Sequence, residues 1–483
     1  MLNLVAWSLG LAAGLFGFAT GMGVTSSFWQ AGLIAAATTG LVVYGVTKRA
    51  VVRLEPAACS RELKIVSGLA TVIAFILLAR LTVFIVDPSQ VAYSVVPSST
   101  WEVQHSCLSA YSVSGDAAAS VPDVYDNSLY SMPDDDPGKP RKAKMLGFFK
   151  IDVYEYPPPF LLAPRVLALL VYDFPHLRML WFGLSGAVAL LSVVVVARFL
   201  SVAVGTRLLL LTPLSWVALA MISTLQKGNA QLPVLAAAMI AMVLFEKRQD
   251  AAGGFLLAFV TMSKLYPGML AVYLLAQRRW RPLAWTAAAG VVILGVSLLD
   301  TGLAPYRAFL RHLPGILSGE AFPAFRNPAA MGLNLSIPGL VFKLKLFGVP
   351  GMSFPAAKIV GWVYTVIVVA VTVMIARRFA SDDDKPSIWC AILVLSTLRS
   401  PFLPIVYGTI PVLGLLCLLA ARRAFDRRAL VGVVAGWLAL SLYWPTDWPA
   451  DPRVLAVVTL IPLGVAILLV TIALRRRVLS PVP

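Results

Sequence analysis

Residues 65–86 read IVSGLATVIAFILLARLTVFIV and contain a single charged side chain, Arg80. A run of this length spans the hydrocarbon core of a bilayer as an α-helix, which needs roughly 20 consecutive apolar residues. Over the whole chain of 483 residues, 59% are hydrophobic and only 13% are charged, whereas a soluble domain carries about 25% charged residues. The composition therefore predicts a polytopic integral membrane protein and excludes soluble, disordered and fibrous classes. Because the apolar runs have helical length, a β-barrel is excluded too.

Apolar runs of this kind recur along the chain and predict an all-α bundle of about 14 transmembrane helices. The expected spans are 4–23, 30–47, 65–86, 177–199, 207–223, 229–246, 251–263, 266–277, 283–299, 355–377, 387–398, 403–420, 429–443 and 454–474. The runs 251–263, 266–277 and 387–398 are short, so a broken helix is the alternative for such pieces. The first run lacks a basic region and a small-residue cleavage site, and we expect it to be a retained helix.

The basic residues predict the orientation in the membrane. The net charge of +17, from 40 Lys and Arg against 23 Asp and Glu, follows the positive-inside rule, and no nucleic-acid partner is expected. With the spans counted above, the basic clusters at 48–64, 278–281 and 475–477 fall on the same side as both termini. The Ala, Val, Arg and Gly usage is that of a high-GC bacterium. We therefore expect a multi-pass protein of the bacterial inner membrane, with cytoplasmic termini and with segments 87–176 and 300–354 on the periplasmic face.

Polar residues that are costly near lipid gather at the outer ends of the spans. Asp87 ends the third span, and the later outer turns contain Asn229, Gln231, Lys264 and Arg399. Ionisable groups at such positions are rare and usually functional, so we expect one cavity at the outer leaflet. A carboxylate at Asp87 would take a proton from a hydroxyl as a general base, while Lys264 and Arg399 would bind a phosphate.

These residues also have plainer interpretations. Asp87 is equally suited to cap a helix, Lys264 to extend from the lipid to the interface, and Asn229 and Gln231 to join helices through hydrogen bonds. On the functional interpretation, a phosphate, a sugar and a hydroxyl meet at the membrane surface. That combination describes glycosyl transfer from a lipid-linked sugar, because nucleotide sugars are made in the cytoplasm.

Several ordered motifs lead to a known family. They are PDVYDNSLY (122–130), YEYPPPFLLAP (154–164), the stretch 227–270 from KGNAQ to KLYPGML, GLNLSIPGLVFKL (332–344) and LSTLRSPFLPIVY (395–407). In order and spacing the region 65–420 resembles glycosyltransferase family 87, which contains polyprenyl-phosphate-mannose-dependent α-mannosyltransferases and related enzymes of the GT-C class.

The resemblance implies a GT-C-type helix bundle with a large outer loop that carries interfacial helices. It also implies a catalytic Asp near the end of the preceding span, which maps to Asp87. Asp116 and Asp123 stay as alternative catalytic residues, because the stretch from Asp87 to the YD motif is long. The expected substrate-binding residues are Lys264, Arg399, Asn229, Gln231, Tyr156, Tyr125 and Asn334.

Three regions are expected along the chain. Residues 1–64 would form a transmembrane hairpin and a cytoplasmic loop, residues 65–420 a GT-C-like transmembrane core with both outer loops, and residues 421–483 a C-terminal transmembrane hairpin. No cofactor or metal is expected. The four cysteines are far apart and show no Cys/His ligand spacing, and the acidic run 134–136 lies among Pro, Gly and Lys like a solvated loop.

The predicted enzyme transfers a sugar, with mannose as the first candidate and a pentose as another, from a polyprenyl-phosphate donor to a hydroxyl of a glycan or glycolipid acceptor. An Asp base and a single displacement predict inversion at the anomeric carbon. Two alternatives stay open at this point. One is a transporter or flippase of lipid-linked cargo, and the other is an assembly subunit that keeps the GT-C fold without activity.

Overall fold

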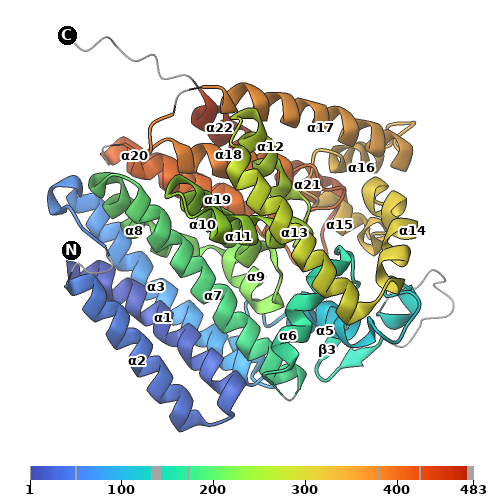
Figure 1. Ribbon diagram of the computed structural model, residues 1–483, viewed down its shortest axis with the longest axis horizontal. Helices are drawn as coiled ribbons and strands as arrows, with labels where there is room; N and C mark the ends of the chain where they lie inside the picture. Colours follow the sequence, from blue (N-terminus) through green and yellow to red (C-terminus); the bar gives the residue numbers. More distant parts are fainter. Residues whose placement is uncertain are drawn as a thin grey trace.

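The structure is a computed structural model, and it describes residues 2–48, 52–131, 143–171, 173–378, 380–423 and 426–475. Helices make up 75% of the described residues and form one bundle (Figure 1), so the expectation of an all-α membrane protein is confirmed. The expected 14 spans are not. In the described ranges, seven helices are long and apolar enough to cross a membrane, or eight if one bent pair counts as a span.

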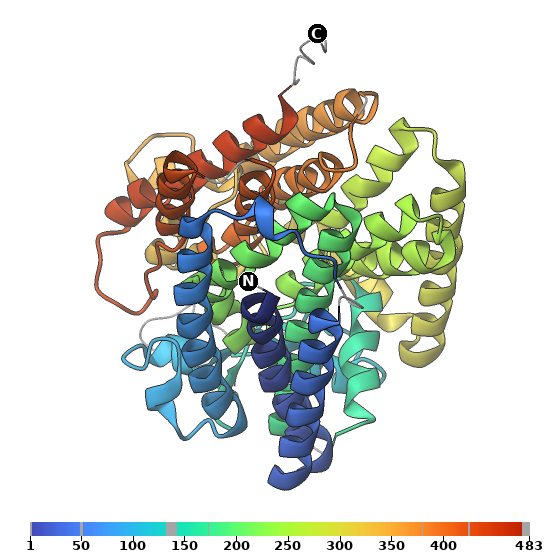
Figure 2. The same ribbon diagram turned by 90° about the vertical axis from the view of Figure 1, so that its left-hand side faces the viewer.

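The long apolar helices include the N-terminal part of the bundle, where α1 and α2 lie side by side (Figure 2). Their bounds are α1 (Leu2–Thr25), α2 (Phe28–Thr47), α3 (Arg61–Val86), α7 (Phe174–Phe199), α13 (Trp280–Thr301), α17 (Phe354–Ala376), α21 (Pro452–Val458) and α22 (Leu460–Leu474). A glycine allows α1 and α7 to pack closely, since a Cβ at Gly183 would lie only 2.6 Å from the carbonyl oxygen of Phe16.

The remaining bundle helices are shorter than a full span. They are α8 (Val202–Val217), α9 (Leu219–Lys227), α10 (Gln231–Glu246), α11 (Asp250–Ser263), α12 (Met269–Ala276), α18 (Lys385–Thr397), α19 (Ile405–Ala421) and α20 (Arg427–Leu440). Ala218 is extended and bends α8 against α9 by 66°. Lys264 is extended between α11 and the turn that precedes α12. These breaks explain why helix length alone does not confirm the expected span count.

The described parts of segments 87–173 and 300–353 form small elements at one end of the bundle. The helices are α4 (Thr100–Gln104), α5 (Cys107–Ala117), α6 (Leu162–Ala168), α14 (Ala304–Ser318), α15 (Pro328–Gly332) and α16 (Gly339–Leu346). The strands are β1 (His105–Ser106), β2 (Met145–Leu146) and β3 (Phe149–Ile151). In the order β1-β3-β2, β1 is parallel to β3 and β2 is antiparallel to it. The same segments contain the 3₁₀ turns η2 (Val91–Tyr93), η3 (Asn127–Leu129), η4 (Pro158–Leu161) and η6 (Pro323–Arg326). Two further 3₁₀ turns lie elsewhere, η1 (Pro56–Ala58) before α3 and η5 (Tyr266–Gly268) between α11 and α12.

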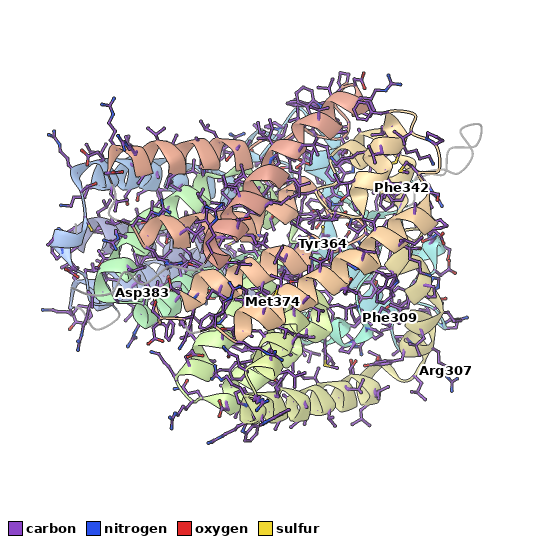
Figure 3. All side chains as sticks on the ribbon, turned by 90° about the horizontal axis from the view of Figure 1, so that it is seen from above. Arg307, Phe309, Phe342, Tyr364, Met374 and Asp383 are labelled. Atoms are coloured by element: carbon purple, nitrogen blue, oxygen red, sulfur yellow. The ribbon has the colours of Figure 1, made fainter. Side chains whose placement is uncertain are left out.

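The two ends of the molecule carry different segments. Figure 3 shows Arg307, Phe309 and Phe342 at one end, while Asp383, in the connection between α17 and α18, lies at the other end. Glu246 at the end of α10 pairs with Lys385 at 2.6 Å, which places the end of α10 beside that connection. The segment 300–354 and the basic ends of α10 and α17 therefore lie at opposite ends of the bundle.

Candidate active site

A cavity of about 850 Å³ lies where residues from 101–157 and 309–333 meet the bundle. Its wall is formed by the start of α5, the segment 152–157, the turn between α9 and α10, the break between α11 and α12, and the segment 396–407. Phe309 of α14 also lines it, so it belongs to the end of the molecule that carries the segment 300–354. This size is typical of pockets that hold a small ligand.

The turn between α9 and α10 depends on a glycine. Gly228 ends α9 in the left-handed region with φ 65°, and a Cβ there would lie 3.0 Å from the Cβ of Leu108. Glycine adopts this conformation without steric cost. The tight turn brings Lys227, Asn229 and Gln231 together at the cavity wall.

Lys264 enters the cavity from the break after α11. Its Nζ donates hydrogen bonds to Oδ1 of Asn229 at 3.3 Å and to Oε1 of Gln231 at 3.1 Å, and it lies 5.2 Å from the centre of the Tyr156 ring. Within the described ranges, no carboxylate lies at ion-pair distance from this ammonium. A half-buried cation that is bound only by neutral groups is suited to an anionic ligand such as a phosphate.

Arg399 supplies a second cation from the segment that follows α18. Its Nε donates to Oγ1 of Thr365 at 2.7 Å, and the guanidinium lies 5.8 Å from the centre of the Trp362 ring. Space for it is left by Gly361, where a Cβ would lie 3.2 Å from the guanidinium carbon. No described carboxylate pairs with Arg399 either, and a guanidinium can bind phosphate oxygens through two parallel hydrogen bonds.

Two carboxylates line the same cavity, Asp152 and Glu155. Burial raises the pKa of Asp152 to about 6, and burial together with the nearby charge of Asp152 raises the pKa of Glu155 well above its ordinary value. Asp152 accepts a hydrogen bond from the N–H of Val153 at 2.9 Å and lies 3.6 Å from Nε2 of His105. The Glu155 carboxylate has no hydrogen-bond or ion-pair partner in the described part of the chain.

A buried ion pair supports the wall beside these groups. Nζ of Lys227 lies 2.7 Å from Oε1 of Glu102, and neither side chain is exposed. Ser223 donates a further hydrogen bond to the same carboxylate at 3.3 Å, and the Lys227 ammonium lies 4.5 Å from the centre of the Trp101 ring. The pair joins α4 of the outer segment to the end of α9.

The structure brings together most of the expected substrate-binding residues. Five of the seven line the cavity, namely Lys264, Arg399, Asn229, Gln231 and Tyr156. The other two do not line the cavity but form hydrogen bonds to residues that do. Tyr125 is buried and donates to the carbonyl oxygen of Tyr156 at 2.6 Å. Asn334 is buried, donates to the carbonyl oxygen of Pro401 at 3.1 Å and accepts from the N–H of Leu403 at 2.9 Å.

Asp87 lies outside the residues that line the cavity. It follows the last residue of α3, and its exposed carboxylate accepts hydrogen bonds from the N–H and hydroxyl of Ser89 at 3.0 and 2.6 Å. These hydrogen bonds lower the pKa of Asp87, which makes the carboxylate a weaker base. The geometry is that of a carboxylate that closes the turn after a helix.

The two alternative catalytic residues also lie outside the cavity lining. Asp123 accepts from the N–H of Tyr125 at 2.9 Å and lies 2.9 Å from Nε2 of His312, so it ties α14 to the outer loop. Asp116 lies near the end of α5 with its side chain exposed to solvent on one side. The loss of hydration on its other side raises the pKa of its carboxyl group. The acidic run 134–136, where no metal site is expected, lies outside the described residues.

The sequence reasoning missed the two carboxylates that do line the cavity. Asp152 and Glu155 stand in DVYEYPPP, and the motif at 154–164 contains Glu155. The available signal was an acidic residue directly before the YPP turn. An acidic residue in a polar loop is ordinary, whereas a carboxylate at the end of an apolar span is not, so the sequence pattern favoured Asp87.

Comparisons with known proteins give one match. Residues 154–404 match the model of a protein family described as glycosyltransferase family 87. The matched stretch begins two residues after Asp152 and includes Lys264 and Arg399, so it contains most of the cavity wall. No curated protein and no solved structure matches the chain.

Proposed function

Because the chain belongs to glycosyltransferase family 87 and is thus a membrane glycosyltransferase, we propose that it transfers one sugar from a polyprenyl-phosphate donor to a hydroxyl of a glycan or glycolipid. The transfer takes place at the periplasmic face of the bacterial inner membrane, and mannose is the first candidate sugar. The proposal is carried by one observation. Two cations that have no carboxylate partner among the described residues, Lys264 and Arg399, line the same cavity as two carboxylates whose pKa values are raised.

The cations suit the donor. When the bond between the anomeric carbon and the phosphate oxygen breaks, its electron pair stays on the oxygen. The lipid phosphate therefore gains negative charge. Lys264 and Arg399 stabilise that charge, and groups placed for a developing charge lower the barrier most when they are fixed in advance. Asn229 and Gln231 hold the Lys264 ammonium through its two hydrogen bonds, which supports this role.

We assign the general base to Glu155 in place of Asp87. Glu155 lines the cavity and its carboxylate is free to accept a proton, whereas the Asp87 carboxylate is exposed and already bound within its own turn. In the proposed step, Glu155 takes the proton of the acceptor hydroxyl while the hydroxyl oxygen attacks the anomeric carbon. The bond to the phosphate oxygen breaks on the opposite face, so a β-linked donor yields an α-linked product.

Sugar transfer in membranes tests this assignment directly. Labelled polyprenyl-phosphate-mannose is supplied, and wild type is compared with Glu155→Gln and Asp87→Asn at equal amounts of membrane-inserted protein. We expect Glu155→Gln to lose transfer by a factor on the order of 100 or more, as for loss of a general base, and Asp87→Asn to retain it. Loss in Asp87→Asn alone would return the base to that position.

The donor is tested separately from the base. If wild type transfers no mannose, the same assay with polyprenyl-phosphate-linked pentose decides whether the sugar assignment alone is wrong. Transfer from neither donor, with lipid-linked cargo moved across vesicles instead, would overturn the enzyme proposal in favour of a carrier.

A further inference from the structure

Three potential metal ligands meet at the cavity wall, and the transfer step proposed above assigns a chemical role to none of them. His105, Cys107 and Asp152 each offer one ligand atom, and these atoms all lie within 4.8 Å of one another. Nε2 of His105 lies 3.6 Å from Sγ of Cys107 and 3.6 Å from Oδ2 of Asp152. All three residues line the cavity.

The two separations from the His105 nitrogen fit a tetrahedral metal ion, and the third pair of ligand atoms, on Cys107 and Asp152, lies within 4.8 Å. With Zn–S near 2.3 Å and Zn–N and Zn–O near 2.0–2.1 Å, neighbouring ligand atoms stand about 3.4–3.6 Å apart. The two distances from the His105 nitrogen are at the upper end of this range, so an ion at the centre would require only small side-chain shifts. A nitrogen, a sulfur and a carboxylate oxygen form a ligand set typical of zinc.

The fold builds this cluster from two distant segments. β1 pairs in parallel with β3, with Ser106 opposite Ile151. The residues that directly follow the two strands, Cys107 and Asp152, therefore lie side by side. The His105 ring is stacked on Trp101 with ring centres 4.2 Å apart. The ligand atoms are therefore fixed by backbone pairing and ring packing, which is how protein metal sites hold their ligands in place.

Two hydrogen-bonding groups beside the sulfur favour its thiolate form, against burial, which raises the pKa of the Cys107 thiol. Nδ2 of Asn229 donates to Sγ of Cys107 at 3.3 Å, and the hydroxyl of Tyr407 lies 3.1 Å from the same sulfur. Amide and hydroxyl hydrogens directed at a sulfur stabilise its negative charge. The nearby cation Lys227 opposes a metal ion, but its charge is balanced by Glu102 at 2.7 Å.

We propose that His105, Cys107 and Asp152 bind a zinc-type divalent ion, with the fourth position open to the cavity. On binding, the Cys107 thiol releases its proton to solvent and Sγ becomes a ligand. The open position accepts an oxygen atom from water or from a ligand in the cavity. This site goes beyond the glycosyltransferase proposal, because its ligands are neither the cations assigned to the donor phosphate nor the assigned base.

Metal content and spectroscopy test the site without any measurement of sugar transfer. The full-length protein is purified in detergent, dialysed against a weak chelator and analysed for bound zinc. It is then loaded with Co²⁺ and scanned for the absorption of a cobalt–thiolate bond. We expect about one zinc ion per chain in the wild type, and a cobalt–thiolate absorption that is lost in Cys107→Ser.

Two further variants complete the test. Cys390→Ser removes another buried cysteine, whose Sγ bonds only the carbonyl oxygen of Pro411 among the described residues, and it is expected to keep both signals. If Cys107→Ser does not fold, His105→Gln replaces it, and zinc affinity is expected to fall at least tenfold. A folded wild type without zinc or a cobalt–thiolate absorption would overturn the proposal, as would either signal persisting unchanged in Cys107→Ser. A negative result for metal binding does not change the result of the transfer assay. The metal-site proposal and the glycosyltransferase proposal can therefore be refuted independently.

Discussion

Lys264 is the side chain on which donor binding depends most directly. Its ammonium has two neutral acceptors and no carboxylate partner in the described part of the chain, so its charge is available to a phosphate. We expect Lys264→Met to lower transfer by a factor of about 100–1,000, the usual loss when one group that stabilises developing charge is removed. Steady-state kinetics with the labelled donor measures the effect.

The matched control for this change is Lys247→Met, at the exposed end of α10. It removes the same charge at the opposite end of the bundle and is expected to leave turnover unchanged. Equal kinetics in Lys264→Met and wild type would remove Lys264 from the donor site.

Glu155 predicts a pH dependence whose direction follows from its burial. A general base works only in its ionised form, and burial raises the pKa of Glu155 well above its ordinary value. The rate is therefore expected to fall as the pH drops through that raised pKa, so kcat/KM should decline at a pH well above the ordinary carboxylate range, about 4–4.5. A profile of kcat/KM against pH checks this, and a rate that stays constant down to about pH 5 would contradict it.

A buried salt bridge connects α4 with α9. Glu102 and Lys227 are both fully buried and lie 2.7 Å apart. Removing one partner leaves the other charge buried and unpaired, which costs about 3–5 kcal/mol in typical proteins. We expect Glu102→Gln to lower the free energy of unfolding by about this amount, as measured by thermal unfolding in detergent.

Two further variants show whether the charge is the cause. In Glu102→Gln/Lys227→Met the unpaired charge is gone, so part of the lost stability should return. Glu320→Gln changes an exposed carboxyl group at the same end of the molecule and should have little effect. If the double variant is no more stable than Glu102→Gln, the unpaired charge of Lys227 is not the cause of the lost stability.

The helices and the break at Lys264 could be predicted from hydropathy, because the expected spans 251–263 and 266–277 stop on either side of that residue, but the bend at Ala218 could not. Every expected span overlaps a helix, because long apolar runs are hydrogen-bonded as helices in lipid whatever their neighbours are. The bend at Ala218 lies inside the expected span 207–223 and leaves little trace in a hydropathy pattern. The break at Lys264 lines the cavity, so a lysine between two short apolar runs marked a part of the site.

For the molecule as a whole, the contents of the cavity were partly predictable. Lys264, Arg399 and Asn229 are polar residues between apolar runs, and their cost near lipid singled them out. Asp152 and His105 stand in a polar outer loop where such residues are ordinary, so nothing local distinguishes them. Only the pairing of β1 with β3 brings them together, and a two-residue strand has too little pattern to predict.

The orientation in the membrane can be tested at two exposed residues that lie at opposite ends of the molecule. Arg307 of α14 is exposed at the end that carries the cavity, and Lys247 is exposed at the other end, beside Glu246 and its partner Lys385. The four native cysteines are buried, so they should react slowly with a membrane-impermeant maleimide. Basic residues concentrate on the cytoplasmic side, which predicts that Lys247→Cys reacts only from the cytoplasm.

In intact cells Arg307→Cys should therefore be labelled at once, and Lys247→Cys only after the membrane is permeabilised. The reverse pattern would keep the two ends apart but invert the protein, and a nucleotide sugar would then become the expected donor because the cavity would face the cytoplasm. Labelling of both variants in intact cells would place both positions outside, which contradicts their location at opposite ends of the bundle. The side of the membrane thus decides the class of donor, since only a lipid carrier can present a sugar phosphate to a site that faces the periplasm.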